Sequence, residues 1–304
     1  MRTVLECYRD IPQQNESSAV ALGFFDGVHT AHAQVIRAVL GKEEYVPTVL
    51  TFSADTVLPV SKAGSGLLMT EEQKRRRIAS LGIQKMFEPS FSEIGGLSAE
   101  AFFEEILYKR LRAQVLSCGY DYHFGKGARG NADLLQKLCL ERKIHLVIVP
   151  RCSDRGITVS SSEIRRAISA GDIMRANELL GYRYTIDGAV VHGRSLGRTL
   201  GFPTLNQRLW KGLLLPKFGV YSSITHICGE TYRSITNIGV KPTIEGDRAP
   251  LAETYMLDAD GDYYGKEASV ELLHMSRPEQ RFSCIEELKE TVLRDIAFRR
   301  TESE

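Results

Sequence analysis

Two histidines stand close together near the beginning of the chain, just after a short apolar run. His29 and His32 are separated by two residues, and Asp26 and Gly27 precede them. If a helix begins here, both imidazoles lie on one side of its first turn, where the helix amides also favour a phosphate. Two imidazoles at that place could stabilise charge on an α-phosphate during nucleotidyl transfer. The same spacing also occurs in incidental surface histidines and in pairs of metal ligands.

A glycine-rich run in the second half is the other place where residue types suggest chemistry. Residues 188–206 read GAVVHGRSLGRTLGFPTLN, with glycine recurring along the run. Glycine allows backbone amides to approach an oligophosphate closely. Thr204 and Asn206 alternate to one face of an extended segment and could supply hard oxygens to Mg²⁺. Glycines alone also fit a plain β-hairpin.

The composition excludes several functional classes. With 43% hydrophobic and 25% charged residues, the chain has the balance of a soluble globular protein. Its formal charge of +1 gives no field that would attract nucleic acid or an anionic membrane, so we expect neither as a partner. Six scattered cysteines without a CxxC pair fit neither disulfides nor zinc and indicate the reducing cytoplasm. No apolar run reaches the ~18 residues of a membrane span, and the first residues lack a signal-peptide core.

The first half of the chain alternates between strand and helix patterns. Thr70 and Gln73 form a capping box that opens a helix toward Leu81, and 98–111 has apolar residues at helical spacing. This alternation predicts right-handed crossovers and a doubly wound α/β sheet, with ligands beyond the carboxyl ends of the strands. The expected strands are the short apolar runs 19–24, 48–52, 83–87, 114–118 and 144–149.

Around Gly181 the pattern changes to strands separated by Gly, Pro and Asp turns. This pattern favours a closed antiparallel barrel or a sandwich. Ser283 and Glu286 form a second capping-box pattern, which predicts a last helix that runs to about Phe298. The expected strands of this half are 184–191, 220–227, 231–238, 252–257 and 268–273.

The length of the chain indicates two domains. At 304 residues it is longer than an average single domain. A polar helix expected at 171–180 separates the two element patterns, so we place the boundary directly after it. The predicted domains are 1–181, an α/β domain, and 182–304, an antiparallel β-barrel with a terminal helix.

The run at 188–206 closely resembles the riboflavin kinase family signature, in which a GRxxGFPTxN-type segment is followed by a distant catalytic glutamate. Here residues 197–206 read GRTLGFPTLN. Leu205 stands where the family usually has alanine. Because it alternates away from the metal-facing side, we expect the change to alter packing rather than chemistry. The resemblance continues, in the family's order, through LPKFGVY at 215–221, NIGVKPT at 237–243, ETYMLD at 253–258, YG at 264–265 and RPEQRF at 277–282.

This resemblance implies a C-terminal barrel that phosphorylates riboflavin with Mg-ATP. Glu253 would be the general base for the ribityl 5′-hydroxyl, while Thr204 and Asn206 would bind Mg²⁺. Arg277 would contact the isoalloxazine or the nucleotide, or would belong to a surface ion pair. The ATP-binding residues that the resemblance implies here are Gly193, Gly197, Arg198 and Gly201.

The N-terminal half resembles the nucleotidyltransferase part of bacterial FAD synthetases, whose kinase domain is the one just described. The run GFFDGVHTAH at 23–32 resembles the (H)xGH-type motif, and VSSSEIR at 159–165 resembles an ISSTxxR segment. The loop GYDYHFG at 119–125 is similar to the one with which the family binds flavin and nucleotide. The implied roles are nucleotidyl transfer for His29 and His32, ATP binding for Asp26, Gly27, Ser162 and Arg165, and flavin binding for Asp121, Phe124 and Asn131.

Three positions in this half depart from the family's pattern. Ala31 replaces the glycine between the histidines, and Ser162 replaces a threonine while keeping the hydroxyl. After the second strand the chain reads FSADT at 52–56, where the family usually has Phe-(Asp/Glu)-Pro-His-Pro. A missing imidazole near the triphosphate costs orders of magnitude in rate if it stabilises the transition state. It costs little if it only orders a loop.

We therefore predict a bifunctional enzyme of FAD biosynthesis that uses riboflavin, FMN and ATP as substrates. Two alternatives stay open: a riboflavin kinase whose adenylyltransferase domain has decayed, and a flavin-binding regulatory protein without turnover. The set Thr204, Asn206 and Glu253 argues against the regulatory protein, because a binder has no need of a base. Nothing in the sequence indicates the oligomeric state.

Overall fold

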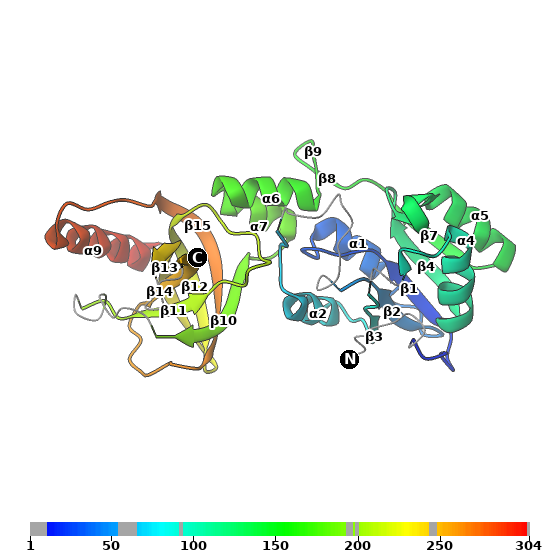
Figure 1. The fold of residues 1–304 in the computed structure, drawn as a ribbon, viewed down its shortest axis with the longest axis horizontal. Helices are drawn as coiled ribbons and strands as arrows, with labels where there is room; N and C mark the ends of the chain where they lie inside the picture. The colour runs from blue at the N-terminus through cyan, green and yellow to red at the C-terminus, as the bar shows by residue number, and fades with distance from the viewer. Residues whose placement is uncertain are drawn as a thin grey trace. The chain divides into compact units, whose positions relative to one another are not determined.

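The computed structural model describes residues 11–53, 66–90, 94–192, 197, 201–242 and 248–302 of the chain. By the packing of its Cα atoms the chain forms two compact units, Met1–Ser161 and Ser162–Glu304. Figure 1 shows a sheet with helices in the first unit and a barrel of strands in the second. Packing therefore groups helix α7 (Ile173–Leu180) and almost all of α6 (Ser161–Ala170) with the barrel. The functional boundary after residue 181 stays a prediction.

The first unit is built on a parallel sheet of five strands. Their order across the sheet is β3-β2-β1-β4-β7, and every pair of neighbours is parallel. The doubly wound fold is therefore confirmed. The order reverses between β1 and β4, so the carboxyl ends of these two strands form the topological switch point where such sheets bind ligands. The strands are β1 (Ser18–Leu22), β2 (Val46–Leu50), β3 (Lys85–Phe87), β4 (Ala113–Gly119) and β7 (His145–Val149).

Helices connect these strands and cover the sheet (Figure 1). The capping box of α2 is confirmed: the Gln73 N–H donates to Thr70 Oγ1 at 3.2 Å, and the Thr70 N–H donates to Gln73 Oε1 at 2.8 Å. Two small antiparallel strand pairs follow β4 and β7. The helices are α1 (Thr30–Arg37), α2 (Glu71–Ser80), α4 (Ala99–Ala101) and α5 (Ala132–Arg142), and the small strands are β5 (His123–Phe124), β6 (Gly130–Asn131), β8 (Ser153–Asp154) and β9 (Ile157–Thr158).

The helix expected at 98–111 is present, but most of it has the wider winding of a π-helix. After α4 the segment Phe102–Arg110 is π-helical, and the N–H of Leu111 donates to the carbonyl of Ile106 at 2.9 Å. Phe102, Ile106 and Leu111 are all buried. In a π-helix the backbone hydrogen bonds join residues five apart. The wider turn keeps Phe102, Ile106 and Leu111, which are four and then five positions apart, on the same buried face.

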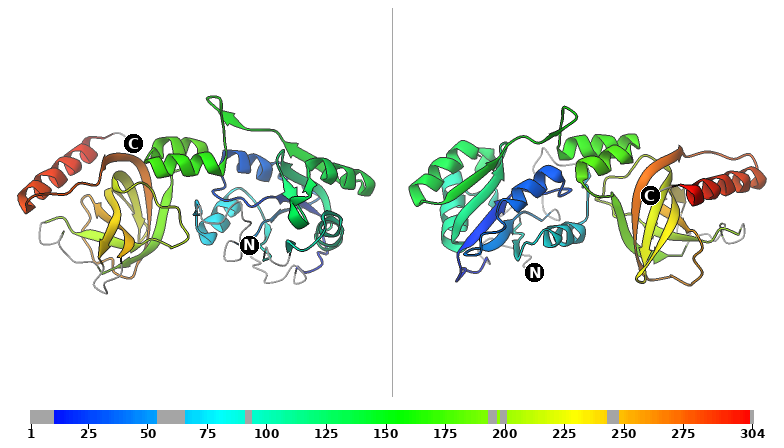
Figure 2. Two further views of the ribbon diagram at one scale, coloured as in Figure 1. Left: turned by 45° about the horizontal axis from the view of Figure 1, so that its top comes forward. Right: turned by 180° about the vertical axis from the view of Figure 1, so that it is seen from behind.

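The second unit is a closed barrel with strand order β10-β11-β14-β13-β12-β15. Figure 2 shows this barrel from two further sides, with helix α9 outside it. The predicted barrel and terminal helix are confirmed. The elements are β10 (Thr185–Val191), β11 (Thr204–Arg208), β12 (Gly219–Ile227), β13 (Glu230–Pro242), β14 (Arg248–Met256), β15 (Glu267–Pro278) and α9 (Ile285–Thr301).

Hydroxyl groups fill part of the barrel interior. Ser223 Oγ lies 2.8 Å from Ser234 Oγ and 2.8 Å from Thr236 Oγ1. The Thr236 hydroxyl is 2.9 Å from that of Thr254, and the Ser234 hydroxyl is 2.7 Å from that of Thr225. All five side chains are fully buried. Because these bonds run between β12, β13 and β14, they favour one register of the three strands over its alternatives.

The side chain of Gln207 connects strands of the barrel where the backbone hydrogen-bond ladder between β10 and β11 is short. Strands β10 and β11 share only two residue pairs. The fully buried amide group of Gln207 donates to the carbonyl oxygens of Gly188 at 2.9 Å and Ala268 at 2.8 Å. These bonds join β11 to β10 and β15, so side-chain hydrogen bonds supplement the short backbone ladder.

Helix α7 is tied to the barrel through Asn177. Its amide donates to the carbonyl of Leu272 at 2.9 Å, and its Oδ1 accepts the N–H of Tyr184 at 2.7 Å. The helix ends at Gly181, which has the left-handed conformation with φ 75°. The helix predicted before residue 181 is thus confirmed.

The capping box predicted at the start of α9 is wrong. Cys284, not Ser283, is the N-cap residue, and its side chain makes no capping hydrogen bond. The N–H and Oγ of Ser283 instead donate to Glu287 Oε2, at 2.9 and 2.8 Å. These bonds lower the pKa of the Glu287 carboxyl. Because the helix begins one residue later than expected, Glu287 rather than Glu286 reaches back to the serine.

We predict that the first unit loses stability in alkaline solution. Burial raises the pKa of the Cys118 and Cys139 thiols from 9.0 to about 12. Below pH 9 both thiols keep their protons in the folded and unfolded states. Above it the unfolded chain releases protons that the folded chain retains, so the free energy of unfolding falls by up to about 1.4 kcal/mol per pH unit for each thiol.

Urea unfolding between pH 8 and pH 11 measures this loss. The double variant Cys118→Ala/Cys139→Ala should show a shallower decline, whereas Cys228→Ala, which alters an exposed thiol, should keep the slope of the parent chain. An unchanged slope in the double variant would contradict the assignment to these thiols.

Candidate active sites

The turn that follows β1 has an unusual backbone. Phe25, Gly27 and Val28 have φ values of 55°, 84° and 32°. For residues other than glycine such conformations cost about 1–3 kcal/mol each, and Val28 is β-branched. A strained turn of this kind persists only when its surroundings hold it. It leads directly to His29.

Asp26 holds this turn in place. Its side chain is 3% exposed, and its Oδ1 accepts the N–H of Leu68 at 2.9 Å. Its backbone carbonyl accepts the hydroxyl of Ser161 at 3.0 Å. These contacts give Asp26 a structural role, while its predicted role in ATP binding stays a prediction. Sequence reasoning named Ser162 and missed Ser161, because the motif alone does not show which serine faces the turn.

The two histidines lie together at the start of α1. Their ring centroids are 3.6 Å apart and nearly parallel, at 15°. His29 is the N-cap residue of the helix, and its Nδ1 accepts the N–H of His32 at 3.3 Å. The ring of Phe25 meets His32 edge-on at 5.4 Å. The predicted pairing of the imidazoles is present, and their catalytic roles stay predictions.

The predicted flavin-binding residues are brought together by the small pair β5–β6. His123 pairs with Asn131 and Phe124 pairs with Gly130, in the loop that leaves the carboxyl end of β4. Asn131 caps α5, because its Oδ1 accepts the N–H of Leu134 at 2.9 Å.

Two of the three predicted flavin-binding residues in this segment, Asp121 and Asn131, are exposed, and Phe124 is buried. Phe124 is 6% exposed and packs on Phe102 at 5.6 Å between ring centroids. The structure thus shows a core contact for Phe124 and a helix-capping contact for Asn131. Contact with flavin stays a prediction for all three residues.

The other predicted ATP-binding residues of this half belong to different units. Gly27 lies in the strained turn after β1, within the first unit. Ser162 and Arg165 lie on α6, within the second unit. Their assignment to ATP stays a prediction. The departure expected at FSADT lies largely outside the described residues, because these end at Ser53 and resume at Gly66.

Glu253 lies in a row of polar residues across three strands of the barrel. In the strand register it stands opposite Asn206 of β11 on one side and Asn237 of β13 on the other. Directly paired residues of antiparallel strands point to the same face, with Cβ atoms about 4.5–5.5 Å apart. Ala252 and Thr254 are fully buried in the barrel, so Glu253 and the two amides face outward. Sequence reasoning missed Asn237, although it begins the matched segment NIGVKPT.

Thr204 and Asn206 lie on this same outer face, as their alternation predicts. Asn206 is 6% exposed, and its amide group donates to the carbonyl of Thr204 at 3.4 Å. Leu205 between them points the other way and belongs to a core cluster with Val190 and Met256. The expected orientation of Leu205, away from the face of Thr204 and Asn206, is therefore confirmed, while the expectation that it leaves the chemistry unchanged stays a prediction.

Glycines shape the turn before β11. A Cβ added to Gly197 would overlap the carbonyl oxygen of Phe202, and the carbonyl of Gly197 accepts the N–H of Phe202 at 2.7 Å. Gly201 has φ +87°, which other residues rarely adopt. Gly193 and Arg198 lie outside the described residues.

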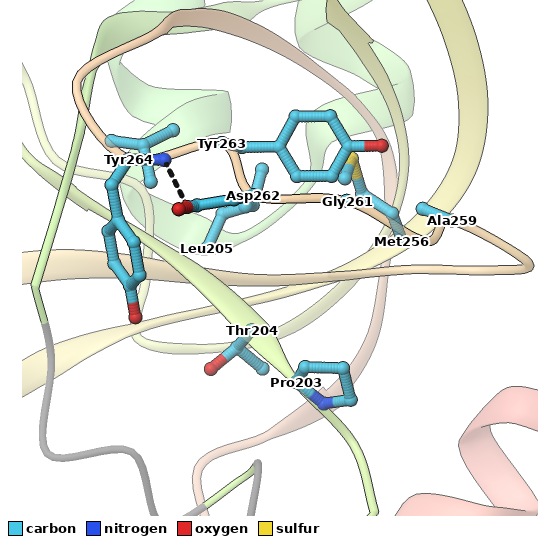
Figure 3. A pocket seen from close by; sticks show the side chains of 10 residues that line it. Pro203, Thr204, Leu205, Met256, Ala259, Gly261, Asp262, Tyr263 and Tyr264 are labelled. Carbon is cyan, nitrogen blue, oxygen red and sulfur yellow. Dashed lines mark hydrogen bonds between the residues drawn. The ribbon is translucent and has the colours of Figure 1, made fainter.

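A pocket opens beside Thr204 at one end of the barrel. Its volume is ≈ 440 Å³ when the open solvent at its mouth is included. Figure 3 shows Tyr263 and Tyr264 on the loop opposite Thr204, with the N–H of Tyr264 bonded to Asp262 Oδ1 at 3.2 Å. Polar and apolar atoms contribute about equally to its lining, and two tyrosines belong to it. Its residues are Val190, Pro203, Thr204, Leu205, Met256, Ala259, Gly261, Asp262, Tyr263 and Tyr264.

Arg277 is bound to the terminal helix. Its Nε and Nη2 donate to Asp295 Oδ2 at 3.0 and 2.9 Å, and its guanidinium lies 5.9 Å from the centroid of the Phe282 ring. Its side chain is 17% exposed and that of Asp295 is 15% exposed. The sequence left a ligand contact and an ion pair as alternatives for Arg277. The ion pair is present, and contact with flavin stays a prediction.

Comparison with known proteins shows which family this chain belongs to. A model of the riboflavin kinase family matches residues 180–302, and one of the FAD synthetase family matches 11–163. A bifunctional riboflavin kinase/FMN adenylyltransferase from Listeria monocytogenes is 36% identical over 90% of this chain and 88% of its own. The chain belongs to this family. The bifunctional enzyme of Escherichia coli is 33% identical over 92% of this chain and 91% of its own.

A solved structure supports the fold of this family member. The crystal structure of a Streptococcus pneumoniae protein described as a macrolide-efflux protein superposes with a TM-score of 0.88 and 27% identity, over 99% of both chains. In the part of the family member that the structure describes, no helix is both long and apolar enough to span a bilayer.

We predict that Gly23→Ala destabilises the turn that carries the histidines. A Cβ at Gly23 would lie 2.7 Å from the ring of Phe25, which is 1% exposed and cannot move outward. Such overpacking costs about 1–3 kcal/mol. Urea unfolding measures the loss. Gly96→Ala is the matched control, because nothing lies within 4 Å of the added Cβ, and equal stabilities of the two variants would refute the prediction.

Proposed function

We propose that this chain makes FAD in two steps, both with ATP. The barrel phosphorylates riboflavin to FMN, and the parallel-sheet unit adenylylates FMN to FAD with release of pyrophosphate. The observation that carries the first step is the row of Asn206, Glu253 and Asn237 on the outer face of the barrel. Glu253 in this row also argues against a flavin-binding regulator, because a protein that only binds flavin has no need of a general base.

In the first step Glu253 acts as the general base. An oxygen of the ribityl 5′-hydroxyl attacks the γ-phosphorus of ATP, its proton passes to the Glu253 carboxylate, and the bond from phosphorus to the ADP oxygen breaks. Asn206 and Asn237, its neighbours in the strand register, are proposed to orient the carboxylate toward the alcohol. In phosphoryl transfer a protein acts mainly by positioning the reactants and stabilising charge, because the transition state is loose and involves little covalent bonding to the enzyme.

The oxygens beside Glu253 fit Mg²⁺. Thr204 and Asn206 offer neutral oxygens on one face of β11, and the Asn206 amide nitrogen is turned to the Thr204 carbonyl. Among the described residues no group of three or more His, Cys, Asp or Glu side chains could hold a metal. Mg²⁺ is usually bound by few protein oxygens together with substrate phosphates, so two neutral side-chain oxygens would suffice beside ATP. When bound, it would neutralise charge on the transferred phosphoryl group.

The pocket beside Thr204 suits the base of ATP. Its two tyrosine rings would contact a planar heterocycle. With the base there, we propose that the phosphates of the same nucleotide extend past Thr204 toward the glycines before β11. The proposed contacts of Gly193, Gly197, Arg198 and Gly201 then fall on the phosphates. Arg277 would contact the flavin from the side of α9, where Asp295 now binds it.

In the second step an FMN phosphate oxygen attacks the α-phosphorus of ATP. The bond to the bridging oxygen of pyrophosphate breaks, and no proton has to be removed from the nucleophile. The residues therefore need to position two anions and stabilise the charge that develops. His29, His32, Asn131 and Arg165 are proposed for this task, with Gly27 and Ser162 at the phosphates and Asp121 and Phe124 at the flavin.

The surroundings of the reactions follow from the chemistry of the substrates. We place the enzyme in the cytoplasm, where riboflavin and ATP are available and where thiols such as the exposed Cys228 and Cys284 stay reduced. Its partners are small molecules, and nucleic acid is not among them, because a formal charge of +1 gives no attraction for it.

Product analysis tests the proposal as a whole. The chain is incubated with riboflavin, ATP and Mg²⁺, and the flavins are separated by chromatography. We expect FMN to form first and FAD to follow. FMN as the final product would support the alternative of a kinase with a decayed adenylyltransferase unit, and unchanged riboflavin would refute the kinase activity.

We predict that Glu253→Gln removes riboflavin phosphorylation while leaving the second step intact. The amide cannot accept the proton of the alcohol, so kcat for FMN formation should fall about 10²- to 10⁴-fold. FAD formation from added FMN serves as an internal control. Glu230→Gln, at an exposed position of β13, should behave like the parent chain. Near-normal FMN formation by Glu253→Gln would remove Glu253 as the base.

A further inference from the structure

Charged side chains are buried where strands β1, β2 and β3 end. Glu88 directly follows β3 and is 2% exposed, and Lys74 of α2 is 3% exposed. Lys74 Nζ lies 2.9 Å from Glu71 Oε2 and 3.8 Å from Glu88 Oε1. Arg75 Nε lies 2.6 Å from Glu88 Oε2. The four residues Glu71, Lys74, Arg75 and Glu88 form the Lys74 cluster, two carboxylates balanced by two cations.

Lys74 joins the two strands beside the histidine turn. Its ammonium donates to the carbonyl of Phe52 at 2.9 Å and lies 5.3 Å from the centroid of the Phe24 ring. Phe24 and Phe52 hold equivalent places, each two residues beyond the last residue of its strand. The hydroxyl of Thr51 adds a direct link, because it donates to the carbonyl of Phe24 at 2.9 Å.

These contacts make a continuous path from Lys74 to the histidines. Phe24 is followed by the strained turn, and α2 is tied to the same turn because the N–H of Leu68 donates to Asp26. The capping residue Thr70 starts α2 two residues after Leu68. The turn is therefore held at Phe24, which contacts Lys74 and Thr51, and at Asp26, which accepts the N–H of Leu68. Lys74 belongs to α2 and Leu68 lies just before the N-cap residue of α2, so both contacts connect the turn to this helix.

Stability alone does not account for a buried ammonium at this place. A buried ion network costs several kcal/mol of desolvation per ion, and well-packed apolar residues often replace one without loss of stability. The cost is visible at Glu88, where burial raises the pKa of the carboxyl although Arg75 and Lys74 act in the opposite direction. What an apolar side chain cannot do is donate to the Phe52 carbonyl. The contact that distinguishes Lys74 is thus with the strand ends.

We infer that Lys74 is a positioning residue for adenylyl transfer: it fixes the ends of β1 and β2 and thereby the turn that presents His29 and His32. This inference rests on the proposed function of the first unit. Lys74 does not touch substrate, because its side chain is 4% exposed. Its effect is on geometry, so it should change kcat for FAD formation and leave the KM values nearly unchanged.

The test compares three variants of the full chain. Lys74→Met removes the donor. Lys74→Met/Glu88→Gln also removes one buried negative charge, so the cluster keeps its charge balance while the bond to Phe52 stays absent. Lys85→Met is the matched control, because Lys85 is also paired, with Gln14 at 3.0 Å and Glu16 at 3.3 Å, but begins strand β3 at its opposite end.

Each variant is assayed for FAD formation from added FMN and for FMN formation from riboflavin, below its own thermal transition. We expect kcat for FAD formation to fall at least about 10-fold in both Lys74 variants, with KM for FMN and ATP within about threefold of the parent. The double variant should regain thermal stability without regaining this rate. FMN formation, and both rates of Lys85→Met, should equal those of the parent.

Two results would overturn the inference. If FAD formation recovers together with stability in the double variant, Lys74 only balances charge. If kcat of folded Lys74→Met equals that of the parent, the carbonyl bond has no effect on the reaction. When Lys74→Met alone does not fold, the double variant decides between these outcomes. A parent chain that forms FMN but no FAD would instead refute adenylyl transfer itself, and the inference with it.

Discussion

The register between β11 and β14 is the constraint on which the barrel site depends. Because side chains alternate along a strand, a slip of one residue would turn Glu253 into the barrel and bring Thr254 out. Several buried contacts oppose such a slip. Leu205 must stay in the core, the Thr254 hydroxyl meets that of Thr236 at 2.9 Å, and the amide of Gln207 reaches two neighbouring strands. The polar interior thus fixes what the outer face presents.

A different constraint governs the parallel-sheet unit. Here the carboxyl ends of neighbouring strands meet at one edge, and the order of the strands places β1 and β4 at the switch point. The chain leaves β1 through left-handed conformations at Phe25 and Val28, which are unfavourable on their own. Buried hydrogen bonds to Asp26 hold them. The conformation of this turn is therefore set by segments distant in sequence.

This difference between local and distant causes explains what the sequence could predict. The strands, the helix pattern, the barrel and the histidine pair follow from local periodicity and from motifs, and the structure contains them. Asn237 and Ser161 were missed, because their relevance appears only once strands are paired and the turn is packed. The N-cap of α9 was misplaced by one residue, since Ser283 has two glutamates within reach, at positions 286 and 287. The partner of Arg277 lies on another element, which periodicity does not reveal.

The two sites also differ because their nucleophiles differ. A ribityl alcohol carries a proton that must leave, so the proposed base, Glu253, is a carboxylate on the barrel face, with Asn206 and Asn237 beside it in the strand register. An FMN phosphate is already anionic, and a carboxylate directed at it would repel it. In the histidine turn the acidic side chain, Asp26, is instead turned to a backbone N–H, and imidazoles stand at the helix start. The different placement of Glu253 and Asp26 thus agrees with the different charge of the two attacking oxygens.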